Sequence, residues 1–221
     1  MKYEILYGDA FPVVSCELEQ GECVKAESDA MIAMSGALDV EGSMDGNILG
    51  GLARKFLAGE KFFFQTIRAS RGAGKVLLGP ATLGGIVDVE LDGSYHLRVQ
   101  KDGFLASTMG INVDTAMQNL MKGLFSREGF FVLDVSGRGT VFLSSFGAIH
   151  AVNLAPGEEL VVDNGHLVAW PDYMDYRIEK ASNGWISSLV SGEALVCRMT
   201  GPASCLSRRA SRKALGCGCR E

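Results

Sequence analysis

The features that usually identify enzymes, secreted proteins and membrane proteins are scarce in this sequence. It has three histidines and five prolines in 221 residues. No run of about eighteen apolar residues is present, so a transmembrane helix is not expected. The start, Met1–Ile5, lacks the basic and then apolar layout of a secretion signal. These absences predict a soluble protein of the cytoplasm.

Composition and charge narrow the class of protein further. The chain is 47% hydrophobic and 21% charged, which is typical of a folded globular protein and excludes general disorder. Its formal net charge of −5 opposes a phosphate backbone, so nucleic acid is not an expected partner. The one cationic patch lies near the C-terminus and consists of Arg208, Arg209, Arg212, Lys213 and Arg220.

The spacing of the six cysteines does not indicate a metal site. Cys16, Cys23, Cys197 and Cys205 stand alone among strand-like apolar residues, where cysteine usually acts as a small buried hydrophobe. The pair in Cys217–Cys219 has no histidine or further cysteine nearby to complete a tetrahedral site. We therefore predict no metal and no cofactor.

Strand signals dominate the chain. Short β-prone runs are bounded by Gly, Pro, Asp or Asn, and 28 glycines mark the turns. Val87–Leu91 and Tyr95–Val99 alternate apolar and polar residues, and Asp92–Gly93 between them predicts a tight hairpin turn. This pattern predicts an all-β sandwich or barrel-like fold. The expected strands are Tyr3–Tyr7, Val13–Leu18, Phe62–Ala69, Lys75–Leu78, Ile86–Leu91, Tyr95–Val99, Phe130–Val135, Thr140–Ser144, Ala148–Leu154 and Leu195–Met199.

One pattern recurs about every 65 residues, which indicates triplication of one supersecondary unit. The clearest echo begins at a glutamate and recurs after 68 and then 65 residues, in Glu60–Thr66, Glu128–Asp134 and Glu193–Met199. A second echo, at offsets of 73 and 62, comprises Asp29–Ala33, Asp102–Ala106 and Asn164–Val168. We predict a single compact chain of three repeats, approximately 5–70, 71–135 and 136–202, followed by a divergent basic, cysteine-containing tail, 203–221.

Two segments interrupt the β pattern and predict short amphipathic helices. They are Ile48–Leu57 and Thr115–Phe125, the second with Asp114 as N-cap. The Met-rich face of the second segment could be a partner groove, although core packing is the preferred interpretation. Ile48–Leu57, with Arg54 and Lys55, also leaves open peripheral membrane association, which its short and Gly-rich character disfavours.

Several of these segments carry a family resemblance: Gly46–Phe63, Arg71–Gly79, Gly137–Leu143, Glu193–Arg198 and Thr200–Pro202. Across roughly Ile5 to Pro202 the chain resembles the mitochondrial biogenesis family, which has bacterial members and a yeast member linked to altered inheritance of mitochondria. The resemblance implies TRAP-like β-sandwich units, similar to the tryptophan RNA-binding attenuator, repeated in a pseudo-threefold arrangement. It also implies a ring-like or trimeric assembly, and with the missing presequence it favours a bacterial setting.

The glycine-rich segments are interpreted as structural. Gly72–Lys75 lacks the Gly-Lys-Ser/Thr ending and the following helix of a phosphate loop. Its recurrence at Gly137–Gly139 indicates turns or bulges that require positive φ. The predicted turn glycines are Gly72, Gly74, Gly137, Gly139 and Gly201.

No catalytic residues are predicted, and the candidate ligand-binding residues are aromatic or histidine side chains. The histidines lack metal-ligand spacing, but His96 and His166 could approach each other if the repeats wrap around an axis. Trp170, Tyr173 and Tyr176 could line a pocket or could pack in the hydrophobic core.

The leading hypothesis is a non-enzymatic, homo-oligomeric binding or scaffold protein with a trimer favoured, because repeated β units leave sheet edges that a closed ring would pair. The alternative is a small-ligand sensor or enzyme whose site lies between repeats or subunits, with an unidentified protein or small molecule as partner. The family brings no established reaction, and the attenuator's own ligands would transfer only by analogy.

Overall fold

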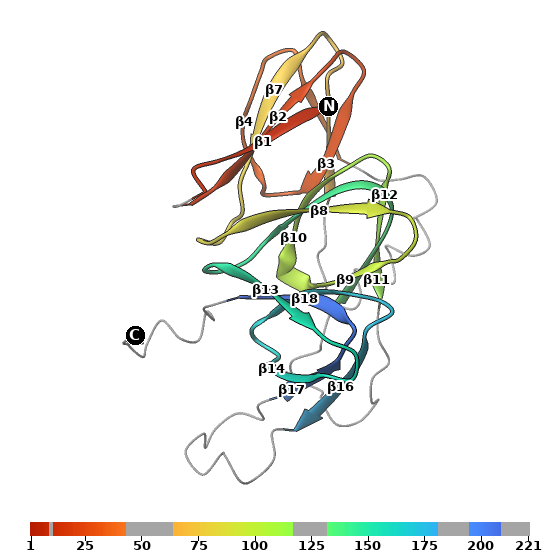
Figure 1. The fold of residues 1–221 in the computed structure, drawn as a ribbon. Coiled ribbons are helices and arrows are strands. Elements are labelled where there is room, and N and C mark those ends of the chain that lie inside the picture. Colours follow the sequence, from red (N-terminus) through yellow and green to blue (C-terminus); the bar gives the residue numbers. More distant parts are fainter. Residues whose placement is uncertain (9–10, 43–63, 117–131, 181–194, 209–221) are drawn as a thin grey trace, which may run out of the picture.

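The computed structural model describes residues 1–8, 11–42, 64–116, 132–180 and 195–208. In these ranges nearly all regular structure is β-strand, and the one helical segment is a 3-10 turn, η1 (Lys101–Gly103). The prediction of an all-β protein is confirmed. As Figure 1 shows, the strands form several sheets that follow one another along the molecule, with the N-terminal strands at one end.

We group the strands into three sets in chain order. The first set is β1 (Lys2–Leu6), β2 (Val13–Leu18), β3 (Cys23–Glu27), β4 (Met31–Met34), β5 (Asp39–Gly42), β6 (Phe64–Arg68) and β7 (Gly74–Leu78). The second set is β8 (Ile86–Asp92), β9 (Leu97–Gln100), β10 (Phe104–Thr108), β11 (Ile111–Ala116) and β12 (Val132–Ser144). The third set is β13 (Ile149–Leu154), β14 (Glu159–Asp163), β15 (Leu167–Pro171), β16 (Asp175–Lys180), β17 (Leu195–Thr200) and β18 (Ala203–Arg208).

The same pairing scheme occurs in each set. In the first set β7 lies between β2 and β4, and β6 lies between β3 and β5. In the third set β18 lies between β13 and β15, and β17 lies between β14 and β16. In the second set the single long strand β12 takes both positions, pairing with β8, β9, β10 and β11.

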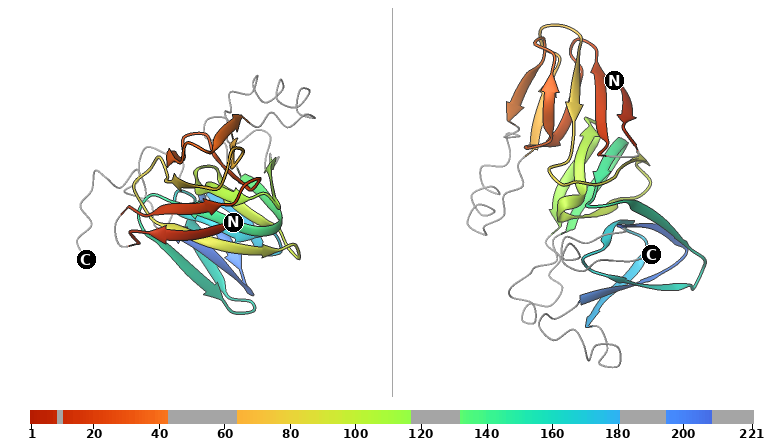
Figure 2. Two further views of the ribbon diagram at one scale, coloured as in Figure 1. Left: turned by 90° about the horizontal axis from the view of Figure 1, so that it is seen from above. Right: turned by 90° about the vertical axis from the view of Figure 1, so that its left-hand side faces the viewer.

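Successive sets are joined by antiparallel pairing of their sheets. β10 of the second set pairs with β3 of the first, and β15 of the third pairs with β9 of the second. The sets therefore form a row, in which the first and third lie at opposite ends in both Figure 1 and the right-hand view of Figure 2. Among the described residues, β4 pairs only with β7 and β14 only with β17.

Burial explains the local sequence patterns. Apolar and polar residues alternate along β8 because one face of the strand packs on the core and the other is exposed. On the exposed face the Tyr3 hydroxyl donates to the Asp88 carboxylate at 2.9 Å. β15 is a continuous apolar run, and all five of its residues are buried. The cores cross the boundaries between sets: Leu105 and Phe142 of the second set belong to the first core cluster, and Val168 of the third belongs to the second cluster.

The predicted second helix is wrong at its start. Thr115 and Ala116 belong to β11, and Asp114 lies opposite Asp134 of β12, so Asp114 is a strand residue and no N-cap. Residue-by-residue pairing with β12 places Thr115 and Ala116 in a strand, where the helix was predicted to begin. The remainder of that segment and the whole of Ile48–Leu57 lie outside the described residues.

The predicted repeats 5–70, 71–135 and 136–202 do not begin and end where the strand sets do, since the strands of the sets span 2–78, 86–144 and 149–208. Residues 203–208, assigned to the tail, form β18, which lies inside a sheet between β13 and β15. Equivalent bulges place Ala33, Ala106 and Ala169 at corresponding positions. The third member of the second echo is therefore displaced by one residue from the expected match at Asn164–Val168.

Of the five predicted turn glycines, Gly74 lies in β7 and Gly137 and Gly139 lie in β12. By backbone conformation the five fall into two groups. Gly72, Gly137 and Gly139 adopt positive φ. Gly74 and Gly201 do not, and they are required instead by close contacts. A Cβ on Gly201 would lie 2.2 Å from the Ala155 carbonyl oxygen, so the backbone approach there leaves no room for a side chain.

Candidate functional site

The edge strand β4 exposes apolar side chains whose counterparts are buried. Ile32 is 57% exposed, whereas Leu105 and Val168, at the corresponding positions of β10 and β15, are 0% and 2% exposed. Met34 is 36% exposed, and its counterpart Trp170 is 0% exposed. β10 and β15 are covered because each pairs on both sides, whereas β4 pairs on one side only among the described residues. We call the exposed residues Met31–Met34 the β4 edge.

An apolar hollow adjoins the β4 edge. It has a volume of about 170 Å³, and Phe11, Ile32, Pro80 and Leu83 contribute to its lining. Phe11 and Leu83 are each 63% exposed. Phe11 also has a φ of 53°, a left-handed conformation that is uncommon for a bulky side chain. A strained backbone here holds an aromatic ring at the surface beside a strand that pairs on one side only among the described residues, which is typical of a contact site.

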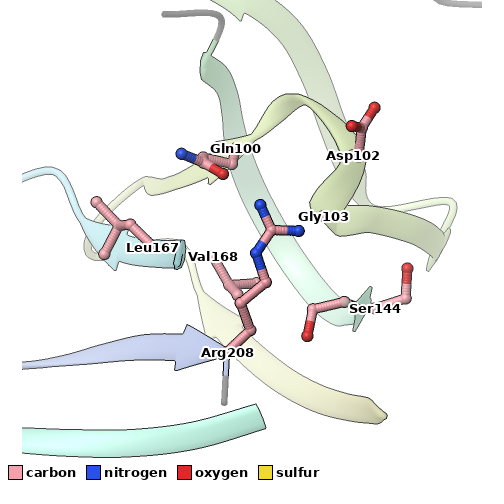
Figure 3. Close-up of a pocket in the computed structure, with 8 residues that line it drawn as sticks. Gln100, Asp102, Gly103, Ser144, Leu167, Val168 and Arg208 are labelled. Atoms are coloured by element: carbon pink, nitrogen blue, oxygen red, sulfur yellow. The ribbon is translucent and has the colours of Figure 1, made fainter. Parts of the chain in front are cut away.

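The corresponding place between the second and third sets is filled (Figure 3). Val168 and Arg208 occupy the positions equivalent to Ile32 and Gly79, and the residues around them leave a cavity of only about 10 Å³. The covering segment is Gln100–Gly103, which connects β9 to β10. Gln100 also bonds across the junction, donating from Nε2 to the Asn164 side-chain oxygen at 3.0 Å. A neighbouring set therefore closes the site that is open beside the β4 edge.

The second exposed edge lies at the other end of the row, on β14. Val161 is 49% exposed, and it corresponds in position to Lys25 of β3 and Arg98 of β9. β14 therefore carries an apolar residue at the position where β3 and β9 each carry a cationic one. Next to it, Arg198 of β17 forms ion pairs with Glu159 at 3.2 Å and with Glu179 at 3.3 Å, which fix the polar side chains of β14 and β16.

The structure separates the predicted aromatic residues. Trp170 is fully buried in the core of the third set, with its ring edge-on to Tyr176 at a centroid distance of 5.1 Å. Tyr173 is 64% exposed and contacts Tyr95 instead, at 5.8 Å. Burial, followed by the nearby Tyr173 and Asp92, raises the pKa of Tyr95. Trp170 and Tyr176 therefore lie together in the core, and Tyr173 lies at the surface of the junction with the second set.

The two candidate histidines have different partners. His96 Nδ1 lies 3.0 Å from the Asp134 carboxylate, and the His96 backbone N–H donates to the Asp172 carboxylate at 3.1 Å. The Asp172 N–H donates in return to the His96 carbonyl at 2.9 Å, which ties the second set to the third. His166 Nδ1 lies 3.1 Å from the Asp163 carboxylate, in the connection between β14 and β15. His96 is thus placed at an internal junction and His166 beside the β14 edge.

The described cysteines are free thiols. Cys16 and Cys197 are fully buried, and burial raises the pKa of each to about 12. Burial also raises the pKa of Cys205. Among the residues that the structure describes, no cluster of three or more His, Cys, Asp or Glu side chains could hold a metal ion. None of the helical structure in those residues is long and apolar enough to cross a membrane.

Sequence patterns alone did not identify the β4 and β14 edges. Met31–Ala33 appeared in an echo, but its four-residue apolar strand was not recognised because a short run gives no periodicity. The usable signal is the alanine that recurs in β4, β10 and β15, at Ala33, Ala106 and Ala169.

Over the described residues these features define an all-β protein of three similarly paired strand sets, with an exposed apolar strand edge at one end of the row and a second strand edge without a partner strand at the other. The sequence profile of the mitochondrial biogenesis AIM24 family matches residues 3–206. The chain belongs to this family.

A relative and a solved structure that this chain resembles both come from Streptococcus pyogenes. An uncharacterized protein of serotype M6 is 34% identical over 203 residues, which cover 89% of this chain and 80% of the relative. An X-ray crystal structure of a protein from the same species has a TM-score of 0.78 with 28% identity, covering 97% of this chain and 96% of the other. The family to which the chain belongs therefore has bacterial members.

Proposed function

We propose that this protein is a non-enzymatic, homo-oligomeric binding or scaffold protein of the cytoplasm, with a closed trimer as the favoured assembly. The observation that carries the proposal is the exposed β4 edge, because β10 and β15 occupy the same position in their sets and are buried. The proposal includes TRAP-like sandwich units, for which the recurrence of the pairing scheme in three sets is the support. Because the sets are joined in a row, the expected pseudo-threefold arrangement within the chain is not part of it.

The chemistry of the β4 edge is that of an interface. Exposed edge strands present unpaired N–H and C=O groups, and monomeric proteins usually protect them with lysine, proline, bulges or covering loops. β4 has the sequence Met-Ile-Ala-Met, with no charged residue and no proline. Its bulge, between Met31 and Ala33, is shared with β10 and β15, which pair on both sides despite it. The edge is therefore suited to receive another strand.

Native mass spectrometry of the gently purified full chain tests the proposal. The expected spectrum contains an oligomer, with a trimer as the dominant closed species, and no additional small-molecule mass. Collision-induced release of intact monomer would verify that the subunits are held by non-covalent contacts. A monomer at every concentration used for spraying, with size-exclusion chromatography and light scattering agreeing, would contradict the homo-oligomeric function.

A second candidate function is supported by the hollow beside the β4 edge. Its volume of about 170 Å³ and its lining by Phe11, Ile32 and Leu83 suit a small apolar group, so a small-ligand sensor or an enzyme with a site between subunits is the alternative. The same spectra distinguish the two. Extra mass of a few hundred daltons on each subunit would favour the ligand site and would be lost in a variant such as Leu83→Arg.

A further inference from the structure

We propose that the β4 edge is the docking site for β14 of a second copy of this chain, paired antiparallel and head to tail. This inference rests on the proposed function, in that it assumes self-association, and it specifies which strands meet and in which register. The occupant is identified by the chain itself, because the equivalent junction occurs twice within the described residues.

Both internal junctions use the same two strand positions. The fourth strand position of one set, β10 or β15, pairs with the third position of the preceding set, β3 or β9. Among the described residues, two strands at these positions have no partner in another set: β4, at the fourth position of the first set, and β14, at the third position of the third set. They lie at opposite ends of the row (Figure 1), so they meet only between copies.

The register follows from the internal junctions. Ala106 lies opposite Ala26, and Ala169 lies opposite Val99. In the first and second sets the residues at this position, Ala26 and Val99, precede the recurring alanines Ala33 and Ala106 by the same interval, and the same interval before Ala169 assigns Val162 to that position in β14. The junction between copies then places Ala33 opposite the second copy's Val162.

The neighbouring pair in this register is Met34 opposite the second copy's Val161. Inside the chain the corresponding pairs are Ser107 with Lys25 and Trp170 with Arg98. Both members of the new pair are apolar and exposed, at 36% for Met34 and 49% for Val161. The cross-strand contact would bury two side chains that water now contacts, which is a favourable pairing on an antiparallel sheet.

The same docking would close the apolar hollow. Within the chain, Gln100–Gly103 covers Val168 and Arg208 (Figure 3). The equivalent connection in the third set is Asp163–His166, between β14 and β15. In the proposed assembly this connection of the second copy lies against Ile32 and Gly79, so the hollow is incomplete without a neighbouring subunit, and His166 is brought to its rim.

The interface is heterologous, because each copy contributes a different strand. A dimer held by a single junction leaves one β4 edge and one β14 edge open. Successive copies instead add in one direction until a ring closes or a fibre grows. Closure into a ring is the form consistent with the trimer proposed above.

Disulfide trapping tests the strands and their register. In a background in which Cys23, Cys217 and Cys219 are replaced by serine, the full chain would carry Met34→Cys with Val161→Cys. Directly opposed residues on neighbouring strands can form a disulfide, whereas residues displaced by two positions are too far apart. The matched control is therefore Met34→Cys with Glu159→Cys. Non-reducing electrophoresis after mild oxidation measures the intermolecular product, and reductant should abolish it.

The expected result is a ladder of covalent dimer and larger species for the in-register pair, at least about tenfold more abundant than for the displaced pair. Native mass spectrometry of the uncross-linked chain separates the two claims. An oligomer whose in-register pair does not cross-link, or cross-links no better than the displaced pair, overturns the β4–β14 pairing and leaves the homo-oligomeric function intact. A monomeric chain overturns both. Circular dichroism matching that of the parent chain excludes misfolding of the variants.

Discussion

Replacing Ile32 by aspartate should weaken assembly strongly while leaving the fold of the single chain intact. The side chain lies on the β4 edge and is 57% exposed in the isolated chain, so the monomer loses little packing when it is replaced. In the proposed assembly the position becomes as buried as Leu105 and Val168, which are 0% and 2% exposed. A carboxylate there would be removed from water without a cationic partner.

The magnitude follows from the exposed fraction. Full burial of an isoleucine side chain is worth about 1.5–3 kcal/mol, so the 57% that remains exposed corresponds to about 1–1.5 kcal/mol of association free energy. Desolvating the unpaired carboxylate adds at least a comparable penalty. A combined loss of about 3 kcal/mol raises the dissociation constant roughly 100-fold, at about 1.4 kcal/mol for each factor of ten.

Sedimentation velocity over a dilution series that spans the midpoint of association measures this change. The control is Val40→Asp, which places the same charge on a 40% exposed residue of another edge strand, β5, and should leave assembly within about twofold of the parent chain. Circular dichroism checks that both variants are folded. A folded Ile32→Asp chain that assembles as well as the parent, or a Val40→Asp chain that is equally impaired, would refute the reasoning.

Three further predictions concern the stability of the chain, measured as the free energy of unfolding in urea. Burial raises the pKa of Cys16 to about 12 against an ordinary value near 9. The stability contributed by its neutral thiol is therefore complete below pH 9 and declines as the pH rises towards 12. The free energy of unfolding should fall by up to about 1.4 kcal/mol per pH unit in this range, and the fall should be shallower in Cys16→Ala. Gly137→Ala should destabilise by more than about 2 kcal/mol, because the residue has a φ of 107° and a Cβ would lie 2.2 Å from the Gly110 carbonyl oxygen; a loss below about 0.5 kcal/mol would contradict this steric account. Ser107→Ala should be neutral or stabilising by about 1 kcal/mol, because the hydroxyl is fully buried without a hydrogen-bond partner among the described atoms; a loss of similar size would reveal a buried water in its place.

The all-β class and several strands were predictable from local sequence. The Val13–Leu18 strand has the predicted bounds, and Ile86–Leu91 ends one residue later than expected, because alternation or dense β-branched composition marks each run directly. Of the four cysteines predicted to be buried, Cys16, Cys197 and Cys205 are buried, since each lies among apolar strand residues, whereas Cys23 at the start of β3 is only partly buried. Such features depend on a residue's immediate neighbours.

The parts that could not be predicted depend on contacts between distant segments. β4 and β15 are apolar runs of four and five residues, too short to show a period, and only their shared pairing reveals that they are equivalent. Trp170 was a candidate for a pocket, and its complete burial results from the packing of strands far apart in sequence. The apolar hollow was not predicted either, because it depends on the lack of a neighbouring strand set over Ile32 among the described residues.

The junctions between strand sets also bear on how such a chain could originate. A shorter polypeptide consisting of one set would carry the third-position and fourth-position strands together, each with one open edge, and would leave its share of the common core exposed. Such single-set molecules would associate with one another through the pairing now seen between β3 and β10 and between β9 and β15. Gene fusion would then have converted contacts between separate molecules into contacts within one, and the two end strands would preserve the original mode of self-recognition.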